Sequence, residues 1–455
     1  GPEDRSPIKA PAAPDPGSIP PALMPPGGHL TIRDSLLGIC DIIFDGGEKM
    51  KSNKPNNTSR REFMKTACGA GIGIAGGVAG LDRAWAQTAA AADADATAMP
   101  QRPFGRTGVK VPILGLGGSQ NFMNRQLLLK QAIKMGVSYW DTADSYSGGR
   151  SEAGIGAYFS KHPEDRKRVF LVTKTSSGSP RGMDASLAES LERLKTDYVD
   201  LFLLHGLSRV EGEVDASVRE WAENAKADGR IRFFGFSTHR NMAACLSQAA
   251  RLGGLDGIMM TYNYRLMQDA RMREAVNDCS KAGIGLIAMK TQGPSLYFGG
   301  DESMQRFIDG GMNKYQARLK AVWENPQIAG ICSHMDSLAI LKENVAAAQD
   351  RAALSDRDRS VLAQHARQTA SAYCAGCGDV CESLLDDAVP VADVMRCLMY
   401  AHRYNDYQMA RAAMGRLPAD IRERLLRADY ARAESRCPQR MAIGQLMRRA
   451  ADELA

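Results

Sequence analysis

Three common sequence patterns are absent from this chain, and each absence argues against one class of function or fold. The formal net charge of +6 is modest for 455 residues and is not gathered into long basic blocks, which argues against nucleic acid as a partner. The apolar run at residues 66–81 is glycine-rich and shorter than the roughly 20 residues of a membrane span. No GxGxxG pattern opens a helix after the first expected strand, because Gly115, Gly117 and Gly118 have the wrong spacing. A Rossmann domain is therefore only the second choice for the fold.

The remaining composition is that of a globular protein. Hydrophobic residues make up 44% of the chain and charged residues 24%, so it can bury at least one large core and can form two or three domains. The ten cysteines are unevenly distributed, and five of them crowd into the last fifth of the chain: Cys374, Cys377, Cys381, Cys397 and Cys437. This close spacing suggests a metal or cluster site.

The N-terminal region contains the parts of an export signal in the expected order. Arg60 and Arg61 precede the small-residue run at 66–81, and Ala84 and Ala86 form a small-x-small cleavage site. This order resembles a twin-arginine signal, which implies the twin-arginine translocase as a partner and a periplasmic or other extracytoplasmic location. If the segment is not cleaved, it would anchor the protein to the membrane.

The same region sets the first domain boundaries. We expect a signal peptide at residues 50–86 and a linker at residues 87–101. Residue 1 is not a methionine, whereas Met50 stands at a suitable distance before the arginine pair. We therefore expect residues 1–49 to be a disordered leader upstream of the true start.

Eight short apolar runs alternate with amphipathic segments between Phe104 and Asp350. The runs are expected strands at residues 111–117, 138–142, 169–174, 201–205, 233–237, 257–262, 285–290 and 328–333. Helical segments, in which apolar residues recur at intervals of three and four, are expected at residues 124–135, 184–195, 214–228, 241–252, 270–282 and 336–350. Continuous apolar strands are buried on both faces, as in a parallel sheet covered by helices. Eight such units in about 250 residues predict an α/β fold of the (β/α)8 TIM-barrel type.

Polar residues stand where three consecutive expected strands end. Asp141, Lys174 and His205 close the second, third and fourth strands, and Tyr146 follows shortly after the first of them. Barrel enzymes carry their chemistry at the C-terminal ends of strands, so these side chains are expected to be neighbours. Singly, such an Asp and Lys are often a structural ion pair, and a lone His is often a satisfied core residue. Together they form a candidate catalytic site.

The four side chains suit the reduction of a carbonyl group. That reaction needs a proton on the oxygen as hydride reaches the carbon, and the ammonium of Lys174 would favour the phenolate and lower the pKa of Tyr146. Asp141 can keep Lys174 charged and oriented. His205 can form a hydrogen bond with the substrate oxygen.

These residues are part of a longer set of motifs that resembles the aldo/keto reductase family over roughly residues 102–350. The motifs are FGRTGVKV at residues 104–111, DTADSY at 141–146 with Ser151 and Glu152 behind it, Lys174, and Asp200-x4-His205. The resemblance implies a catalytic tetrad of Asp141, Tyr146, Lys174 and His205, with Tyr146 as the proton donor. It also implies NADP or NAD as the hydride source and a small carbonyl or alcohol as the substrate.

The same resemblance implies a set of cofactor contacts. The matching residues are Ser237 and Thr238 after the fifth strand, and Ser333, Glu343 and Asn344 in the late adenosine-side motif. Two positions depart from the family pattern: Met259 stands where the family has a glutamine, and Ala339 stands where an arginine would grip a 2′-phosphate. The second departure weakens the case for NADP over NAD.

Residues 351–455 are expected to form a separate α-helical domain, because the alternation of strands and helices stops after residue 350. Its cysteines make us expect an iron–sulfur domain. The segment carries four candidate metal ligands, Cys374, Cys377, Cys381 and Cys437. Ferredoxins use the spacing C-x2-C-x2-C-x3-C-P, and the spacing between Cys377 and Cys381 is one residue longer than in that pattern. Some aldo/keto reductases carry a ferredoxin-like C-terminal extension, and this chain resembles that subset.

One set of four thiolates suits a single 4Fe-4S cluster. Zinc is the alternative, because four thiolates also build a closed tetrahedral site. Cys397 lies in an apolar helical stretch, so we expect it to be a buried apolar residue, or an alternate ligand. A redox-active cluster would require an electron-transfer partner.

Two functions are consistent with these observations. The first is an exported oxidoreductase that acts on a carbonyl or alcohol and carries one cluster. That cluster either transfers electrons or only stabilises the fold of the C-terminal segment. The second is a non-catalytic binding or scaffold protein on a drifted reductase barrel with a structural metal site. The complete tetrad favours the enzyme, whereas Met259 and Ala339 favour the alternative. Residues 292–300, with Tyr297 and Phe298, are expected to shape part of the substrate pocket.

Overall fold

A computed structural model describes residues 98–293, 311–385 and 389–454, together with Leu296, Met304 and Phe307. The expected leader at residues 1–49, the expected signal at residues 50–86 and the linker up to residue 97 lie outside the described residues. Tyr297 and Phe298 lie outside them as well. None of the helices in the described part of the chain is long and apolar enough to cross a membrane.

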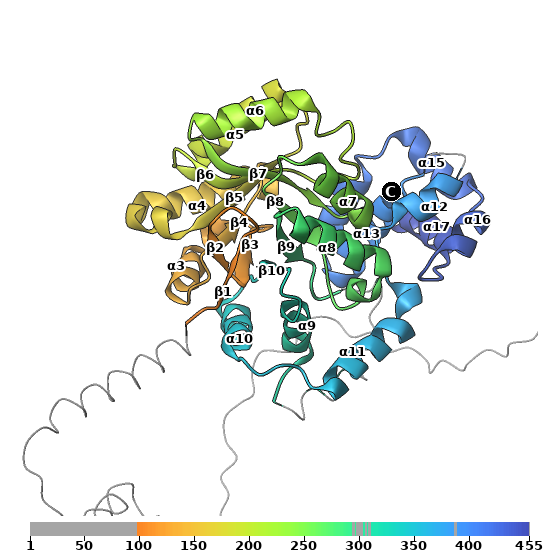
Figure 1. The fold of residues 1–455 in the computed structure, drawn as a ribbon. Helices are drawn as coiled ribbons and strands as arrows, with labels where there is room; N and C mark the ends of the chain where they lie inside the picture. The colour runs from red at the N-terminus through yellow and green to blue at the C-terminus, as the bar shows by residue number, and fades with distance from the viewer. Residues whose placement is uncertain are drawn as a thin grey trace, which may run out of the picture. The chain divides into compact units, whose positions relative to one another are not determined.

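Eight parallel strands close into a barrel, in the order β10-β3-β4-β5-β6-β7-β8-β9 (Figure 1). The strands are β3 (Leu114–Gly117), β4 (Tyr139–Asp141), β5 (Phe170–Thr175), β6 (Val199–Leu204), β7 (Ile231–Thr238), β8 (Gly257–Thr261), β9 (Gly285–Met289) and β10 (Gly330–His334). Each of the eight expected strands overlaps one of them. The (β/α)8 barrel is confirmed, and the Rossmann alternative is excluded.

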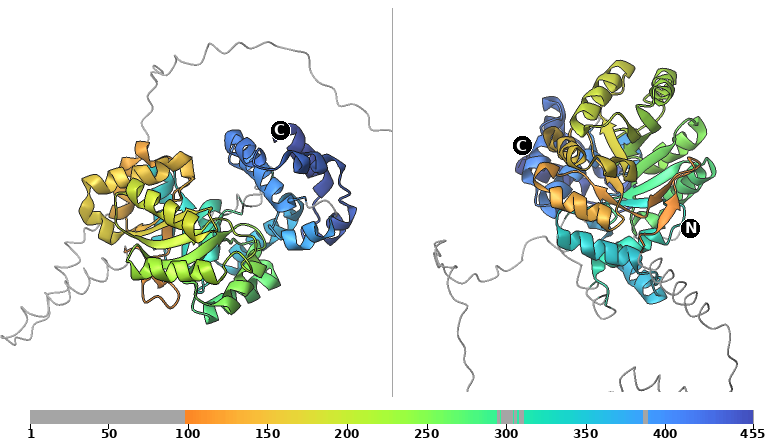
Figure 2. Two further views of the ribbon diagram at one scale, coloured as in Figure 1. Left: turned by 90° about the horizontal axis from the view of Figure 1, so that it is seen from above. Right: turned by 90° about the vertical axis from the view of Figure 1, so that its left-hand side faces the viewer.

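Helices surround the closed sheet (Figures 1 and 2). They are α3 (Gln126–Lys134), α4 (Arg150–Lys161), α5 (Pro180–Leu194), α6 (Ala216–Ala227), α7 (Met242–Leu252), α8 (Ala270–Lys281), α9 (Lys314–Trp323) and α10 (Leu338–Gln349). Short 3-10 helices are η1 (Phe122–Asn124), η2 (Tyr146–Gly149), η3 (Pro163–Arg168) and η4 (Leu266–Gln268). Side-chain oxygens of Ser179, Asp215, Asp269 and Ser337 accept hydrogen bonds from first-turn N–H groups, which fixes where α5, α6, α8 and α10 begin.

The prediction of one continuous first strand at residues 111–117 is wrong. Strands β1 (Gln101–Pro103) and β2 (Lys110–Pro112) form an antiparallel hairpin, and β3 begins only at Leu114. Pro112 has no N–H to donate, and the N–H of Ile113 donates to Pro100 instead of continuing a barrel ladder. Phe104 in the hairpin loop is fully buried against Gly257 and Gly285, where a Cβ atom would collide with its ring. The hairpin therefore closes the N-terminal end of the barrel.

Two hydrophobic cores lie on the two faces of the barrel sheet. In β5, Phe170 and Val172 face the barrel interior, whereas Leu171 between them packs with the core under the helices. Side chains alternate between the two faces of a strand, so the next interior position on β5 is Lys174. The same alternation on β4 places Tyr139 and Asp141 on the interior side.

The residues after the barrel are helical. They form α11 (Asp356–Gln368), α12 (Gly378–Cys381), α13 (Val391–Arg403), α14 (Tyr407–Met414), α15 (Ala419–Arg427), α16 (Ala431–Arg436) and α17 (Ile443–Leu454), with η6 (Ala370–Ala372) and η7 (Glu382–Leu384). Leu362 of α11 packs with Tyr264 of the barrel, whereas α13 to α17 share a separate core. Packing therefore divides the chain after about residue 373, because α11 belongs with the barrel. Residues 374–454 are called the C-terminal unit below.

Candidate active site

Three of the predicted catalytic side chains meet at the C-terminal ends of β4 and β5. The Lys174 ammonium donates to Asp141 Oδ1 at 2.5 Å and to the Thr142 carbonyl oxygen at 2.7 Å. It also donates to the Tyr146 hydroxyl oxygen at 3.4 Å. Lys174 and Asp141 are buried, with 1% and 3% of their surface exposed. The structure therefore brings together a buried acid, a buried ammonium and a partly buried phenol in one group.

The loop that carries Tyr146 is held in place by its own sequence. Ser147 and Gly148 have φ values of 52° and 62°, so the chain turns in the left-handed region directly after Tyr146. Behind the turn, Ser151 donates to the Gly118 carbonyl oxygen, and the buried Glu152 accepts hydrogen bonds from Thr173 and Arg193. These contacts tie α4 to β3 and β5, and so fix the position of the tyrosine.

His205 joins this group from the end of β6. Its backbone N–H donates to the Thr175 carbonyl oxygen, and its ring packs edge-on against the Tyr146 ring with 5.5 Å between centroids. Burial, with a smaller contribution from the nearby cations of Lys174, Lys290, Arg396 and Arg416, lowers the pKa of His205 to about 3. The imidazole is therefore neutral around pH 7.

The phenol of Tyr146 differs from our expectation. We expected Lys174 to lower its pKa, and the ammonium does act in that direction. Burial, however, is the larger influence, so the pKa of Tyr146 is raised. Burial is the largest single influence on Lys174 and would lower its pKa, but the charge and the hydrogen bond of Asp141, together with the charge of Tyr146, outweigh it, so the pKa of Lys174 is raised and the ammonium stays charged. At neutral pH the phenol keeps its proton and can donate it.

The expected cofactor residues lie at two places on the same end of the barrel. Ser237 Oγ on β7 accepts from the Gly206 N–H at 3.0 Å, and Ser333 Oγ on β10 accepts from Asn344 Nδ2 at 3.2 Å. Both serine hydroxyls keep their own O–H for a ligand. Thr238 is fully buried and donates to the Arg240 carbonyl oxygen, and Glu343 is exposed and accepts from Asn313. Ser333 and Asn344 are thus brought together, whereas Thr238 and Glu343 are engaged elsewhere.

The two departures from the family pattern have visible consequences. Met259 is 2% exposed and packs in the apolar cluster inside the barrel, where a glutamine would have offered an amide. Ala339 lies in the first turn of α10 and contributes only a methyl group.

The four candidate metal ligands line one cavity in the C-terminal unit. Cys374, Cys377, Cys381 and Cys437 surround a space of about 20 Å³, together with apolar side chains such as Met395 and Ile443. Burial, with smaller contributions from nearby cysteines and carboxylates, raises the pKa of Cys377 to about 11 and that of Cys381 to about 12. Cys397 does not line this cavity and packs in the core of the unit. The structure thus brings the four predicted ligands together and leaves Cys397 apart.

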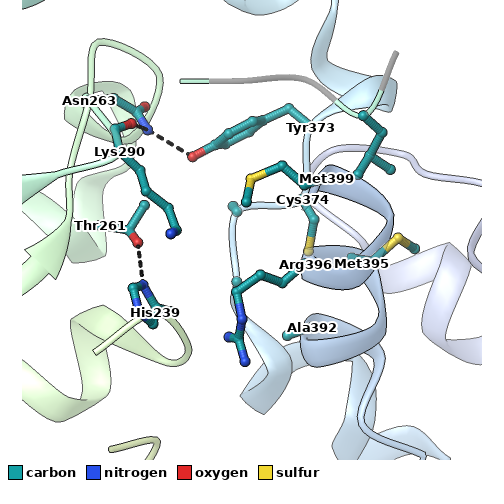
Figure 3. Close-up of a pocket in the computed structure, with 13 residues that line it drawn as sticks. His239, Thr261, Asn263, Lys290, Tyr373, Cys374, Ala392, Met395, Arg396 and Met399 are labelled. Atoms are coloured by element: carbon teal, nitrogen blue, oxygen red, sulfur yellow. Dashed lines mark hydrogen bonds between the residues drawn. The ribbon is translucent and has the colours of Figure 1, made fainter. Parts of the chain in front are cut away.

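A second cavity of about 50 Å³, here called the junction cavity, lies between the barrel and the C-terminal unit (Figure 3). His239, Thr261, Asn263 and Lys290 line it from the ends of β7, β8 and β9. The other lining residues are Leu296, Tyr373, Cys374, Ala375, Gly376, Ala392, Met395, Arg396 and Met399. Asn263 donates to the Tyr373 hydroxyl oxygen at 2.9 Å across the cavity. Cys374 therefore lines both cavities.

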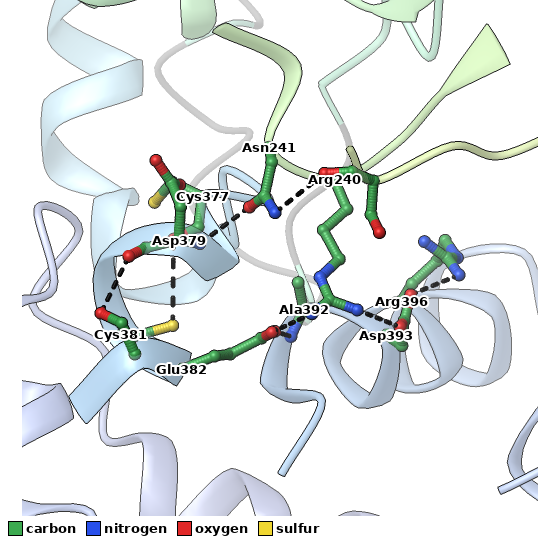
Figure 4. A network of polar contacts seen from close by, with 11 residues as sticks. Arg240, Asn241, Cys377, Asp379, Cys381, Glu382, Ala392, Asp393 and Arg396 are labelled. Carbon is green, nitrogen blue, oxygen red and sulfur yellow. Dashed lines mark hydrogen bonds and ion pairs between the residues drawn. The ribbon is translucent and has the colours of Figure 1, made fainter. Parts of the chain in front are cut away.

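Polar contacts fasten the cysteine segment to the end of β7 (Figure 4). The Arg240 guanidinium binds the carboxylates of Glu382 and Asp393. The Asn241 N–H donates to the Gly376 carbonyl oxygen at 2.7 Å, and its side-chain oxygen accepts from the Asp379 N–H at 2.8 Å. Only His239 separates Arg240 and Asn241 from the predicted cofactor residues Ser237 and Thr238, so the two sites share one connecting loop.

Sequence reasoning missed several residues of this region. Lys290 directly follows β9, and Lys174 lies near the C-terminal end of β5. The rule that polar residues at the C-terminal ends of barrel strands form the site, which indicated the tetrad, could therefore also have indicated Lys290. Arg240 and Arg396 had no such signal, because only the docking of the C-terminal unit gives them their partners.

Comparisons with known proteins agree on one family. The model of the aldo/keto reductase family matches residues 113–368. The uncharacterized oxidoreductase YqkF of Bacillus subtilis is 24% identical over 316 residues, which cover 59% of this chain and 97% of that protein. A D-threo-aldose 1-dehydrogenase of Pseudomonas sp. is 26% identical over 267 residues, which cover 50% of this chain and 79% of that protein. The solved structure of the aldo-keto reductase AKR11C1 from Bacillus halodurans, in its holo form, has the same fold. Its TM-score is 0.50 at 21% identity, and the match covers 59% of this chain and 96% of that one.

Proposed function

This chain belongs to the aldo/keto reductase family, and we propose that it is an exported oxidoreductase of that type. The proposed reaction is hydride transfer between a nicotinamide nucleotide and a small carbonyl or alcohol. The proposal adds one 4Fe-4S cluster in the C-terminal unit. The observation that carries the catalytic part is the contact of the buried Lys174 with both Asp141 and Tyr146.

The tetrad supports carbonyl reduction step by step. A reduced nicotinamide, when bound, would supply a hydride to a carbonyl carbon. Tyr146 can give its phenolic proton to the carbonyl oxygen, and the Lys174 ammonium stabilises the phenolate that remains. Asp141 holds Lys174 in its charged form. The neutral imidazole of His205 can donate a hydrogen bond to the same carbonyl oxygen and orient it toward Tyr146.

The residues present suit a nicotinamide nucleotide in part. The free O–H groups of Ser237 and Ser333 support binding, and Asn344 orients the second of them. Glu343 is exposed at the adenosine-side position. We also propose Thr238 as a contact, because it stands at the matching position of the family motif. Ala339 offers no cation for a 2′-phosphate, so the proposal covers both NADP and NAD.

The cysteine cavity supports a centre with four thiolate ligands, Cys374, Cys377, Cys381 and Cys437. Such a ligand set suits one 4Fe-4S cluster and also a zinc ion. Zinc sites more often pair two CxxC motifs, and this chain has one, which favours the cluster. Such a cluster supplies one-electron transfer, for which we propose an electron-transfer partner.

The export part of the proposal rests on the order of residues 60–86. The twin-arginine route carries folded, loaded proteins, which suits a protein that receives its cluster and nucleotide in the cytoplasm. The proposed location is periplasmic or extracytoplasmic, with membrane anchoring if the signal is not cleaved. Because free nucleotide is scarce there, the proposal requires a tightly retained cofactor.

A second function has specific support. Met259 fills with apolar atoms the place where the family has a glutamine, which favours a non-catalytic binding protein on a drifted barrel with a structural metal site.

One purification separates these possibilities. The full-length protein, purified without oxygen, is expected to show the broad visible absorption of an iron–sulfur cluster and to release nicotinamide nucleotide on denaturation. A colourless protein that contains zinc would contradict the cluster, and a protein that neither retains nor binds NADPH or NADH would contradict the reductase.

A further inference from the structure

We propose that Arg240 and Asn241 are positioning residues that join the cysteine centre to the nucleotide site, so that loading of the centre determines how tightly the nucleotide is held. This inference rests on the proposed function, because it states how the two proposed cofactors depend on each other. The residues present fit the centre, since four thiols line one cavity. The joining contacts are made by residues outside the tetrad.

The segment at residues 373–385, called the cysteine segment, supplies three of the four thiols but has little regular structure. Its helices α12 and η7 have four and three residues. Such short segments open at a small cost in free energy. Cys437 supplies the fourth thiol directly after α16, so a loaded centre would cross-link the segment to the packed helices. Without the centre, the segment would depend on its contacts with the barrel.

The cysteine segment is bonded to the loop that follows β7 (Figure 4). The Asn241 N–H donates to the Gly376 carbonyl oxygen at 2.7 Å, and the Asp379 N–H donates to the Asn241 side-chain oxygen at 2.8 Å. The Arg240 guanidinium binds the carboxylate of Glu382, whose side chain is 11% exposed. Two of the cysteines stand between these bonded residues, so a movement of the centre would be passed directly to the loop.

Close backbone packing adds to these hydrogen bonds. Gly376 has a φ of 73°, and a Cβ atom there would lie 2.6 Å from the His239 carbonyl oxygen. The loop and the segment therefore approach as closely as a glycine permits. Tyr373, at the start of the segment, accepts a hydrogen bond from Asn263 at 2.9 Å. The segment is thus fastened to the ends of two neighbouring strands, β7 and β8.

The same loop leads to the predicted nucleotide contacts. Thr238 donates to the Arg240 carbonyl oxygen at 2.8 Å, so the loop fixes its side chain. Ser237 Oγ accepts from the Gly206 N–H and keeps its own O–H for the nucleotide. Only three residues separate Ser237 from Asn241. A displacement of Asn241 would therefore change the position of both predicted contacts.

Loading of the centre would then select the loop conformation that binds nucleotide. In the metal-free protein, the segment and the loop would open for part of the time, and only the closed fraction would bind. The apparent Kd rises by the inverse of that fraction, so a closed fraction of about one tenth raises it about tenfold. An exported protein would thus retain its nucleotide for as long as it keeps its centre.

The first test breaks the link while the centre stays loaded. Asn241 has a φ of 55°, which glycine adopts readily, so Asn241→Gly removes the side-chain bonds to Asp379 and Ser208 without backbone strain. In full-length protein purified without oxygen, the Kd for NADPH or NADH should rise about fivefold to thirtyfold, with the metal content unchanged. Asn241→Asp keeps an oxygen for the Asp379 N–H and should restore most of the affinity. Asn405→Gly is the matched control, because Asn405 has a φ of 52° and is exposed, and it should leave the Kd unchanged.

The second test removes the centre. Cys437 does not line the junction cavity, so Cys437→Ser should act on the nucleotide only through the centre. Its Kd for the same nucleotide should rise at least tenfold, measured by fluorescence titration below the temperature at which the C-terminal unit unfolds. Adding Asn241→Gly to this variant should raise the Kd by less than about twofold more, because both changes break the same link. Cys397→Ser should leave the Kd unchanged.

Three outcomes would overturn the inference. An unchanged Kd in Asn241→Gly would do so, and so would fully additive effects in the double variant. A protein that binds nucleotide tightly but holds no metal would also do so, and it would leave the reductase proposal standing.

Hydrogen exchange measured without nucleotide keeps the link separate from the reductase function. The backbone N–H groups of Asn241 and Asp379 should exchange at least tenfold faster in Cys437→Ser than in the wild-type protein. If no nucleotide binds but this acceleration is found, the reductase proposal fails and the link between the centre and the loop stands. Unchanged exchange would show that the centre does not hold the loop, and would overturn the inference.

Discussion

The tetrad and the junction cavity lie at the same end of the barrel but are built in different ways. Asp141 and Lys174 come from neighbouring strands whose interior positions alternate, so local sequence and topology are enough to bring them together. Arg396 reaches the junction cavity only because a separate helical unit docks on the barrel. The difference teaches that strand order within the barrel is enough to assemble the tetrad, whereas the junction cavity exists only through a tertiary contact.

The largest effect is expected from Tyr146→Phe, which acts on the tetrad alone. Loss of the phenolic proton should lower kcat by about a hundredfold to ten-thousandfold, because the variant cannot protonate the carbonyl oxygen. Nucleotide affinity and the absorption of the cysteine site should not change. Stopped-flow kinetics and fluorescence titration measure these quantities, and unchanged turnover would show that another group is the acid.

Cys437→Ser acts on the other region. It removes one of the four thiols that line the cysteine cavity, so iron content should fall from about four atoms per chain toward zero and the C-terminal unit should unfold at a lower temperature. Iron analysis and calorimetry measure both. Cys397→Ser is the matched control in the same unit, and equal iron loss there would reassign the ligand set.

Arg240→Gln breaks the contact between the two regions. It removes the partner that Glu382 and Asp393 share, and all three side chains are partly buried, so the free energy of unfolding should fall by about 1–3 kcal/mol. Arg359→Gln is the control. It removes a more exposed ion pair with Glu324 and should cost less than about 1 kcal/mol. Equal losses in urea titrations would mean that the Arg240 contacts contribute no more than an ordinary surface pair.

The effect that is smallest per unit of pH is a gradual pH dependence of stability from His205. Its pKa is near 3 in the folded protein and about 6.5 in the unfolded chain, so the unfolded state binds more protons between these values. Stability that is present above pH 6.5 should decrease as the pH falls toward 3, by at most about 1.4 kcal/mol per pH unit for this residue. His205→Gln should flatten the profile measured by urea titration, and an unchanged slope would show that His205 does not contribute.

Much of the fold could be predicted because the sequence repeats one pattern. The eight apolar runs indicated the parallel strands, and the polar residues after them indicated which end of the barrel carries the site. The break at Pro112 was missed, because the apolar run 111–117 continues through a hairpin and into β3 without a polar residue. The buried Phe104 shows why the hairpin is there.

The candidate site could be predicted only where the order of residues along the chain and the alternation of side chains along a strand determine it. Lys174 could be placed beside Asp141, but the degree of burial that raises the pKa of Tyr146 depends on the whole packed structure. The cysteine spacing indicated the four residues around the second cavity. It gave no sign that Cys374 would also line the junction cavity, since that contact joins segments more than a hundred residues apart.

The measurement that tests the account most directly follows the hydride itself. The holoenzyme would be supplied with NADPH or NADH deuterated at both C4 positions and with a small aldehyde, and the alcohol product examined by mass spectrometry. The account predicts one deuterium on the former carbonyl carbon with the intact chain, and at least a hundredfold less labelled product with Tyr146→Phe. An unlabelled alcohol, or no product with either nucleotide, would contradict it.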